Sequence, residues 1–183
     1  ITGRRIEEVE RKGKFLIFRL SDDRLLVINP MLTGAFQYCG PNDRVFKKTS
    51  VVFSLSNGSD LRYLDDRQMG RVYYITPGRL DAVPQFDTLG PDVLEDMPFE
   101  EFRERLRPFH GEIKGILTRG RVISGIGNAY ADEVLFAAKV YPFRKRKSLS
   151  DGELRRLHRM CRIVVEDAIG ILRERMGESI HVK

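Results

Sequence analysis

The sequence has few of the residues from which metal centres and disulfide frameworks are built. Its two cysteines, Cys39 and Cys161, lie far apart and form no CxxC pair, and its three histidines (His110, His158 and His181) are scattered. A metal site needs ligands at close, regular spacing, so we expect no metal site in this chain. Both cysteines are expected to be reduced residues in or near a core, as in a cytosolic protein.

Long apolar runs are also missing. No stretch approaches the roughly 20 residues that a membrane-spanning helix needs, and no signal-peptide pattern is present, so we expect no membrane partner and a cytoplasmic location. The hydrophobic content of 42% predicts a packed core, and the formal net charge is +6. Such a charge favours a polyanionic partner, nucleic acid first and a membrane surface second; a merely basic soluble protein is the alternative.

Short apolar runs separated by turn residues fill the first part of the chain, from Arg4 to about Tyr74. Asn57-Gly58 is a dipeptide typical of tight hairpins. Short strands joined by tight turns predict an antiparallel sandwich or barrel. The strand-like runs occupy residues 15–20, 25–28, 51–55, 61–64 and 72–75.

The spacing of apolar residues becomes helical from Pro98 onward, with Pro98 expected at the first helical position. Further helices are predicted over about 112–117 and 129–138. A last helix should begin at Ser150, where Glu153 completes a capping box. The last helix should bury one stripe of residues: Leu154, Leu157, Cys161, Val164, Ala168 and Ile171.

The predicted fold class is therefore α+β, in two domains. An antiparallel β-sandwich, incomplete at its N-terminal side, should occupy residues 1–83. A linker should follow at 84–97, and a helical domain at 98–183.

Residues 124–133, Ser-Gly-Ile-Gly-Asn-Ala-Tyr-Ala-Asp-Glu, form a glycine-rich turn before a helical pattern. A helix N-terminus offers unpaired N–H groups and a positive dipole end, which suit a phosphate. The segment resembles the signature of the helix–two-turn–helix motif in formamidopyrimidine-DNA glycosylases and their endonuclease VIII relatives. The resemblance covers nearly the whole of this chain, but the two ends that family members have are missing from it.

The resemblance implies a base-excision-repair glycosylase with AP lyase activity, which flips oxidised bases out of duplex DNA and cleaves the backbone by β-elimination. The implied partner is duplex DNA with damaged bases or abasic sites, bound by a monomer in the bacterial nucleoid. Family members begin with Pro-Glu, whose amine attacks the sugar, and most end in a four-cysteine zinc finger. This sequence contains neither. We therefore expect an internal piece, inactive alone, with no cofactor of its own and zinc in a finger outside it.

Four residues correspond to family positions that contact DNA, and Lys14 is also the candidate catalytic residue. Lys14 ends a basic step before a strand, where the family's lysine contacts the lesion-site phosphate and assists proton transfer; a solvated strand end is the alternative. Lys48 falls near a DNA-contacting histidine, or is simply a basic loop residue. Lys114 and Asn128 match residues that grip phosphates beside the lesion, and Asn128 can also cap the following helix.

Two loops correspond to the family's stack-opening loops. In residues 29–34, Leu32 takes the place of a methionine that enters the gap left by the flipped base; a core residue at a strand turn is the alternative. Residues 65–70, Asp-Asp-Arg-Gln-Met-Gly, resemble the family's Asp-Pro-Arg-Arg/Lys-Phe-Gly. Arg67 would reach the orphaned base, or pair with a neighbouring aspartate. Met69 would replace an aromatic wedge with a softer one.

Two rival hypotheses stand beside the glycosylase. A noncatalytic protein that binds lesions or unusual DNA structures could use the same scaffold, since both wedge loops differ from the family pattern. Helix–two-turn–helix modules also occur in ribosomal and topoisomerase-associated proteins, although the loop at 65–70 argues against these.

The cationic run at 144–147 would add nonspecific, salt-sensitive attraction to phosphates.

Overall fold

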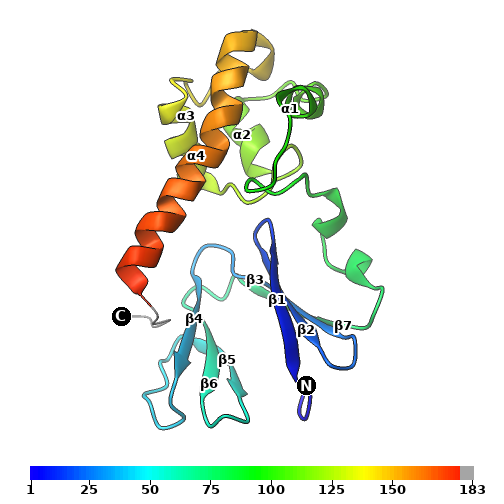
Figure 1. Ribbon diagram of the computed structural model, residues 1–183, viewed down its shortest axis with the longest axis vertical. Coiled ribbons are helices and arrows are strands. Elements are labelled where there is room, and N and C mark those ends of the chain that lie inside the picture. The colour runs from blue at the N-terminus through cyan, green and yellow to red at the C-terminus, as the bar shows by residue number, and fades with distance from the viewer. Residues whose placement is uncertain (178–183) are drawn as a thin grey trace. The chain divides into compact units, whose positions relative to one another are not determined.

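The computed structural model describes residues 1–177 (Figure 1). They form two compact units: residues 1–79 together with the end of the last helix from Arg173, and residues 80–172. In the described part of the chain, no helix combines the length and apolarity that crossing a membrane would require.

The first unit is built from two antiparallel sheets, as the sequence predicted (Figure 1). The four-stranded sheet has the order β1-β2-β3-β7, and the three-stranded sheet has the order β4-β6-β5. The strands of the first sheet are β1 (Ile6–Lys12), β2 (Phe15–Leu20), β3 (Leu25–Asn29) and β7 (Arg71–Ile75). Those of the second are β4 (Gly34–Cys39), β5 (Thr49–Ser54) and β6 (Asp60–Asp65).

Apolar side chains from both sheets share one core, which makes the unit a sandwich. Phe18 and Ile28 of the first sheet cluster with Tyr63 of the second, and Phe36 packs against them. The Phe36 ring centroid lies 5.4 Å from that of Tyr63 and 6.1 Å from that of Phe18. Side chains of this kind each stabilise the fold by about 1.5–3 kcal/mol when fully buried.

The predicted hairpin at Asn57-Gly58 is confirmed. Gly58 has a φ of +82°, a conformation that glycine adopts without steric cost. The Leu55 N–H donates to the carbonyl of Ser59 at 2.8 Å and closes the turn between β5 and β6.

A fully buried arginine, Arg62, lies on β6 of the second sheet. It pairs with Asp60 at 2.9 Å and donates to backbone carbonyls of the loop after β4, including those of Gly40 and Asp43. A buried guanidinium is tolerated because its donors are all directed at acceptors. Arg62 thus ties an irregular loop to the sheet.

The four predicted α-helices lie in the second unit, apart from the end of the last one: α1 (Phe99–Leu106), α2 (Ile113–Thr118), α3 (Asn128–Ala137) and α4 (Asp151–Met176). Three short 3₁₀ helices accompany them: η1 (Leu80–Ala82), η2 (Phe86–Thr88) and η3 (Arg146–Ser148). Pro98 precedes α1 as its N-cap and is not its first residue. One apolar core joins these helices through Phe102, Leu106, Ile113, Leu117, Leu135 and Leu157.

The predicted capping box opens α4. The Glu153 N–H donates to Ser150 Oγ at 3.3 Å, and the Ser150 N–H donates to Glu153 Oε2 at 2.8 Å. Arg144 also donates to the Glu153 carboxylate through both of its terminal nitrogens. The Arg144 hydrogen bond, followed by that from Ser150, lowers the pKa of Glu153 from 4.5 to about 2.

The predicted buried stripe of α4 is confirmed only along its first half. Leu154, Leu157 and Cys161 are buried, and Val164 packs partly against the same core. Ile171, in contrast, is 49% exposed. Helical periodicity identifies residues that share a face, but the length of the partner surface decides how many of them are covered.

Candidate nucleic-acid interface

Strand register in the first sheet brings three sequence-distant segments to one end of the sheet. Lys14 lies in the turn between β1 and β2, directly before Phe15. Leu16 pairs with Ile28, and Asn29 pairs with Arg71. The β1–β2 turn, the start of the 30–33 loop and the residue before β7 are therefore neighbours at this end.

The second sheet continues the same arrangement. Gly34 pairs with Asp65, so the segments that enter and leave the two sheets here are adjacent. The Asp65 N–H donates to the Lys48 carbonyl at 2.8 Å. The structure thus brings together all five predicted residues of this unit, namely Lys14, Leu32, Lys48, Arg67 and Met69.

The 30–34 loop presents an apolar side chain to solvent. Met31 has a φ of +51°, and its N–H donates to Asn29 Oδ1 at 3.1 Å. The Gly34 N–H donates to the Pro30 carbonyl at 2.9 Å and closes the loop. Leu32 is 66% exposed, so the alternative of a core residue is wrong. An exposed leucine on a closed loop is the geometry that an intercalating wedge requires.

The 65–70 loop presents a cation and a second apolar side chain. Arg67 is exposed, and Met69 is 38% exposed. Asp65, a suggested ion-pair partner of Arg67, is only 3% exposed, and it accepts hydrogen bonds from the Thr33 hydroxyl and the Gly70 N–H. The guanidinium therefore gains little from this neighbour and keeps its donor fork in solvent.

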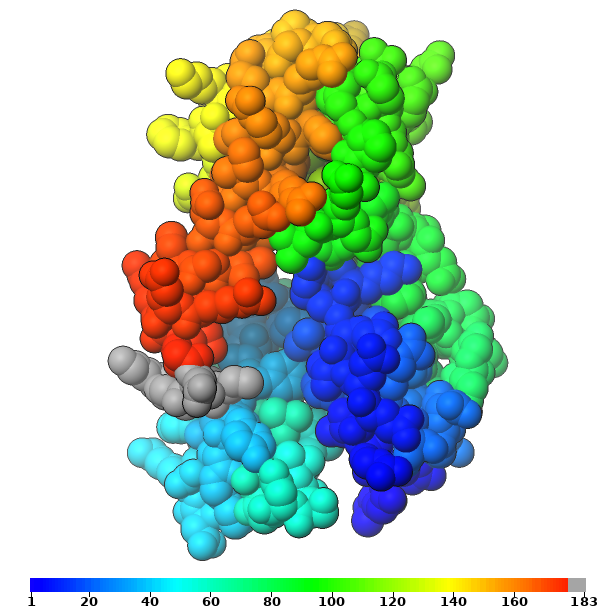
Figure 2. Space-filling model, viewed as in Figure 1, coloured from blue at the N-terminus to red at the C-terminus, as the bar shows by residue number. Residues whose placement is uncertain are grey.

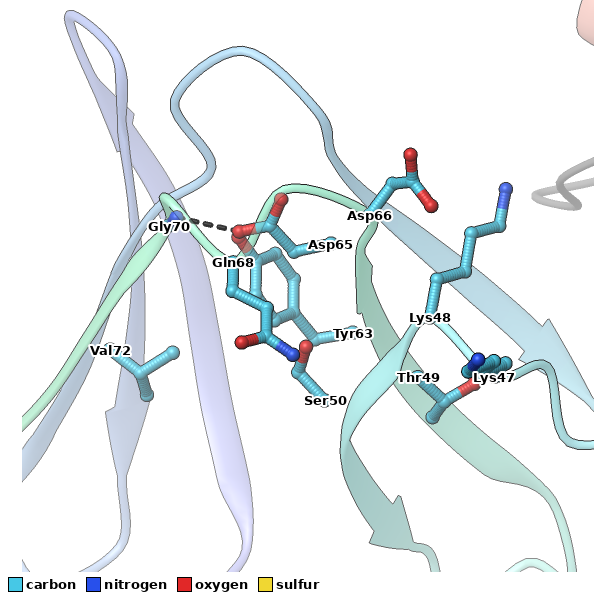
Figure 3. A pocket seen from close by; sticks show the side chains of 10 residues that line it. All are labelled: Lys47, Lys48, Thr49, Ser50, Tyr63, Asp65, Asp66, Gln68, Gly70 and Val72. Carbon is cyan, nitrogen blue, oxygen red and sulfur yellow. Dashed lines mark hydrogen bonds between the residues drawn. The ribbon is translucent and has the colours of Figure 1, made fainter.

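A polar cavity of about 710 Å³ lies beside these loops (Figure 3). Its lining runs from the start of β5 to the start of β7, with Tyr63 and Asp65 between them. Lys48 lines this cavity, and its Nζ lies 5.9 Å from the centre of the Phe46 ring. Lys47, which sequence reasoning missed, lies next to it on the same wall. Together they give the cavity a cationic side.

Lys14 is partly desolvated at the turn into β2. It follows Gly13, whose φ of +58° makes the sharp turn into β2 possible. The residue is exposed by surface area, yet partial desolvation of its ammonium lowers the pKa of Lys14.

The glycine-rich turn of the second unit is held from behind by a distant segment. Gly125 has a φ of +98°, and the Ser124 N–H donates to the Pro91 carbonyl at 2.8 Å. A Cβ at Gly90 would lie 2.6 Å from the carbonyl oxygens of Arg121 and Val122, so only glycine fits there. This packing fixes the turn that leads into α3.

Asn128 is the first residue of α3, and Gly127 occupies the N-cap position without a side-chain hydrogen bond. The expectation that Asn128 caps the helix is therefore wrong, because a residue already inside the helix does not occupy the capping position. Its side chain remains beside the helix N-terminus, where phosphate binding was predicted.

Lys114 on α2 forms an ion pair with Asp132 on α3, with 2.8 Å between Nζ and Oδ2. Asp132 lies one helical turn after Asn128, so Lys114 and Asn128 are close. The carboxylate, which sequence reasoning missed, offsets part of the charge of Lys114. A phosphate here would share or replace that partner.

The cationic run after α3 is divided between packing and solvent. Arg144 binds Glu153, whereas Lys145 and Lys147 are exposed. Before them, Tyr141 and Phe143 are 65% and 60% exposed and form an edge-to-face pair with centroids 5.5 Å apart. Figure 2 shows side chains of the region around α3, in yellow, projecting from this unit.

The cysteines show the chemistry of packing residues. Cys161 is fully buried, and burial raises the pKa of its thiol to about 12. Cys39 is partly buried and also unpaired. Within residues 1–177, no three histidine, cysteine or acidic side chains gather as a metal site would require. That this chain holds no metal stays a prediction.

Two family models match the chain in succession. The N-terminal domain of formamidopyrimidine-DNA glycosylase matches residues 1–72, and the H2TH domain of formamidopyrimidine-DNA glycosylase matches residues 89–179. The formamidopyrimidine-DNA glycosylase of Pelotomaculum thermopropionicum is 36% identical over 170 residues, which are 92% of this chain and 62% of that protein. That of Symbiobacterium thermophilum is 36% identical over 98% of this chain and 57% of its own length.

Solved structures agree with these matches. The MutM (Fpg) protein of Thermus thermophilus has a TM-score of 0.84 and 36% identity, over 92% of this chain and 61% of that one. The Lactococcus lactis Fpg in complex with abasic-site DNA has a TM-score of 0.86 and 28% identity, over 100% of this chain and 66% of that one. The chain thus spans about 60% of the length of its curated relatives. The chain belongs to the formamidopyrimidine-DNA glycosylase family.

Proposed function

We propose that the protein acts in base-excision repair as a DNA glycosylase with AP lyase activity on oxidised bases in duplex DNA. One observation carries the proposal: two adjacent loops at one end of the sandwich expose Leu32, Arg67 and Met69, which combine apolar wedges with a donor fork. An enzyme that flips a base must fill the gap and satisfy the orphaned base, and these side chain types suit both tasks.

Backbone contacts would come from both units. Lys14 and Lys48 supply cations at the loop end of the sandwich, and Lys114 with Asn128 would hold phosphates at the start of α3. Neutralised phosphates release counterions, so binding should weaken steeply with salt. The net charge of +6 supports this attraction.

Binding by the 183-residue chain tests the recognition step. The chain should bind a duplex with one tetrahydrofuran abasic-site analogue more tightly than the matched intact duplex, as measured by their dissociation constants. Arg67→Ala should reduce that preference, whereas Lys114→Ala should weaken binding to both duplexes alike. Arg5→Ala is the matched control, because Arg5 is exposed and precedes β1, at the opposite end of that strand from Lys14. Equal affinity for both duplexes would contradict the proposal.

Borohydride trapping on a duplex with a natural abasic site tests the chemical step. A covalent adduct would show that an amine within these residues forms a Schiff base, and its loss in Lys14→Ala at a protein concentration that still saturates the duplex would identify the amine. Lys14, in the turn between β1 and β2 at the loop end of the sandwich, is the first candidate. Selective binding without an adduct would place the nucleophile outside these 183 residues.

A further inference from the structure

Asp65 occupies an unusual position for a carboxylate. It ends β6 between the two wedge loops and is 3% exposed. An ionised carboxylate at such a site is stable only when donors surround it. Burial by itself would raise the pKa of Asp65, but hydrogen bonds from the Thr33 hydroxyl and from backbone N–H groups at Gly70, Arg67 and Met69 lower it overall.

The donors come from both loops. The Thr33 hydroxyl donates to Asp65 Oδ1, and the Gly70 N–H donates to Asp65 Oδ2 at 2.6 Å. The Arg67 N–H in turn donates to Thr33 Oγ1 at 3.3 Å. The hydroxyl of Thr33, the residue after Leu32, therefore connects the Asp65 carboxylate to the backbone of Arg67.

Close packing makes this arrangement stiff. A Cβ added at Gly34 or at Gly70 would overlap the Tyr63 hydroxyl oxygen, so each loop ends with its backbone pressed against the same ring. Tyr63 is itself 2% exposed within the sandwich core. The side chains of Leu32 and Met69 project from a rigid base.

We propose that Asp65, acting through Thr33, is the positioning residue that holds the two wedge loops in the spacing needed to enter a DNA stack at a damaged site. The inference rests on the proposed function. Neither group needs to touch DNA: the carboxylate is buried, and the hydroxyl is occupied by its two loop partners. Loops that are already ordered avoid the entropy cost of ordering on binding. This gain in affinity applies only where Leu32 and Met69 enter the duplex.

The test compares Thr33→Val, which removes the hydroxyl, with Thr33→Ser, which keeps it, and with Asp65→Asn. Thr33→Val should lose about tenfold in affinity for the tetrahydrofuran duplex, the effect of one hydrogen bond to a charged group, with the intact duplex unchanged. Thr33→Ser should restore the affinity, and Asp65→Asn should lose at least as much as Thr33→Val. Thr88→Val is the matched control, since its hydroxyl serves only the η2 turn.

Two further readouts separate positioning from a merely structural role. A 2-aminopurine beside the abasic analogue reports whether the wedges enter the stack, and its fluorescence change should shrink in Thr33→Val at saturating protein. Amide hydrogen exchange of Arg67 and Gly70 without DNA should accelerate in Thr33→Val and not in Thr88→Val. Urea unfolding shows whether each variant stays folded.

The outcomes are distinguishable. If Thr33→Val matches the wild type in its preference for the abasic analogue, its 2-aminopurine response and its amide exchange, this inference is overturned and the proposed function stays intact. A parallel loss on both duplexes that follows stability would also overturn it. A wild-type chain without preference for the abasic analogue would remove the proposed function, and this inference with it.

Discussion

The charge of Glu153 should stabilise the helical unit by an amount that depends on pH. In the folded protein Arg144 and Ser150 bind the carboxylate and lower its pKa from 4.5 to about 2. At about 1.4 kcal/mol per pKa unit, this difference sets a ceiling of about 3.5 kcal/mol. The side chain is 19% exposed, and solvent screening reduces the value, so we expect about 2 kcal/mol.

Glu153→Gln tests this contribution, because glutamine can still accept the Ser150 N–H of the capping box but loses the charge and one of the two oxygens that accept hydrogen bonds from Arg144 and Ser150. The free energy of unfolding, measured by urea titration with far-UV circular dichroism, should fall by about 2 kcal/mol at about pH 7. Since the folded pKa lies below the unfolded value, the contribution is complete above pH 4.5 and is lost as the pH falls through about 2. More than half of the difference between the two proteins should be gone at about pH 3.

Glu166→Gln is the matched control on the same helix. Glu166 pairs with Arg162 at 2.7 Å, but both side chains are 46% exposed, so the change should cost less than about 0.5 kcal/mol. If Glu153→Gln behaves like this control, or if its effect is the same at about pH 3 and about pH 7, the reasoning from the Arg144 contact is wrong.

Three further predictions concern packing. Phe102→Ala removes a fully buried ring from the helical core and should lower the free energy of unfolding by about 3–5 kcal/mol in a urea titration. Gly70→Ala places a Cβ against the Tyr63 hydroxyl and should destabilise the sandwich unit by about 1–3 kcal/mol, measured by thermal unfolding; unchanged stability would show that the loop can shift. Cys161 should not react with Ellman's reagent at about pH 8 until urea is added, because burial raises the pKa of its thiol to about 12.

Local patterns were enough to predict most elements of this fold. The short apolar run of β2, the Asn57-Gly58 turn and the Ser150–Glu153 box depend on neighbours a few residues away. Such signals are present in any short window of sequence. The short motifs that contain Leu32, Arg67 and Met69 were also visible in the sequence, and the structure exposes all three side chains; their role as wedges and donor stays a prediction.

The adjacent aspartates 65 and 66 show where local reasoning stops. Nothing in their immediate sequence separates them, yet Asp65 is buried and bound by Thr33, 32 residues away, whereas Asp66 is exposed. The same holds for the burial of Arg62, and for Asp132 as the partner of Lys114. The sequence by itself determined the element types, the family resemblance and the loop side chains that we propose for contact with DNA. Only the tertiary structure decided which charges are buried and which are paired, because burial and pairing depend on groups that the fold brings together from distant parts of the chain.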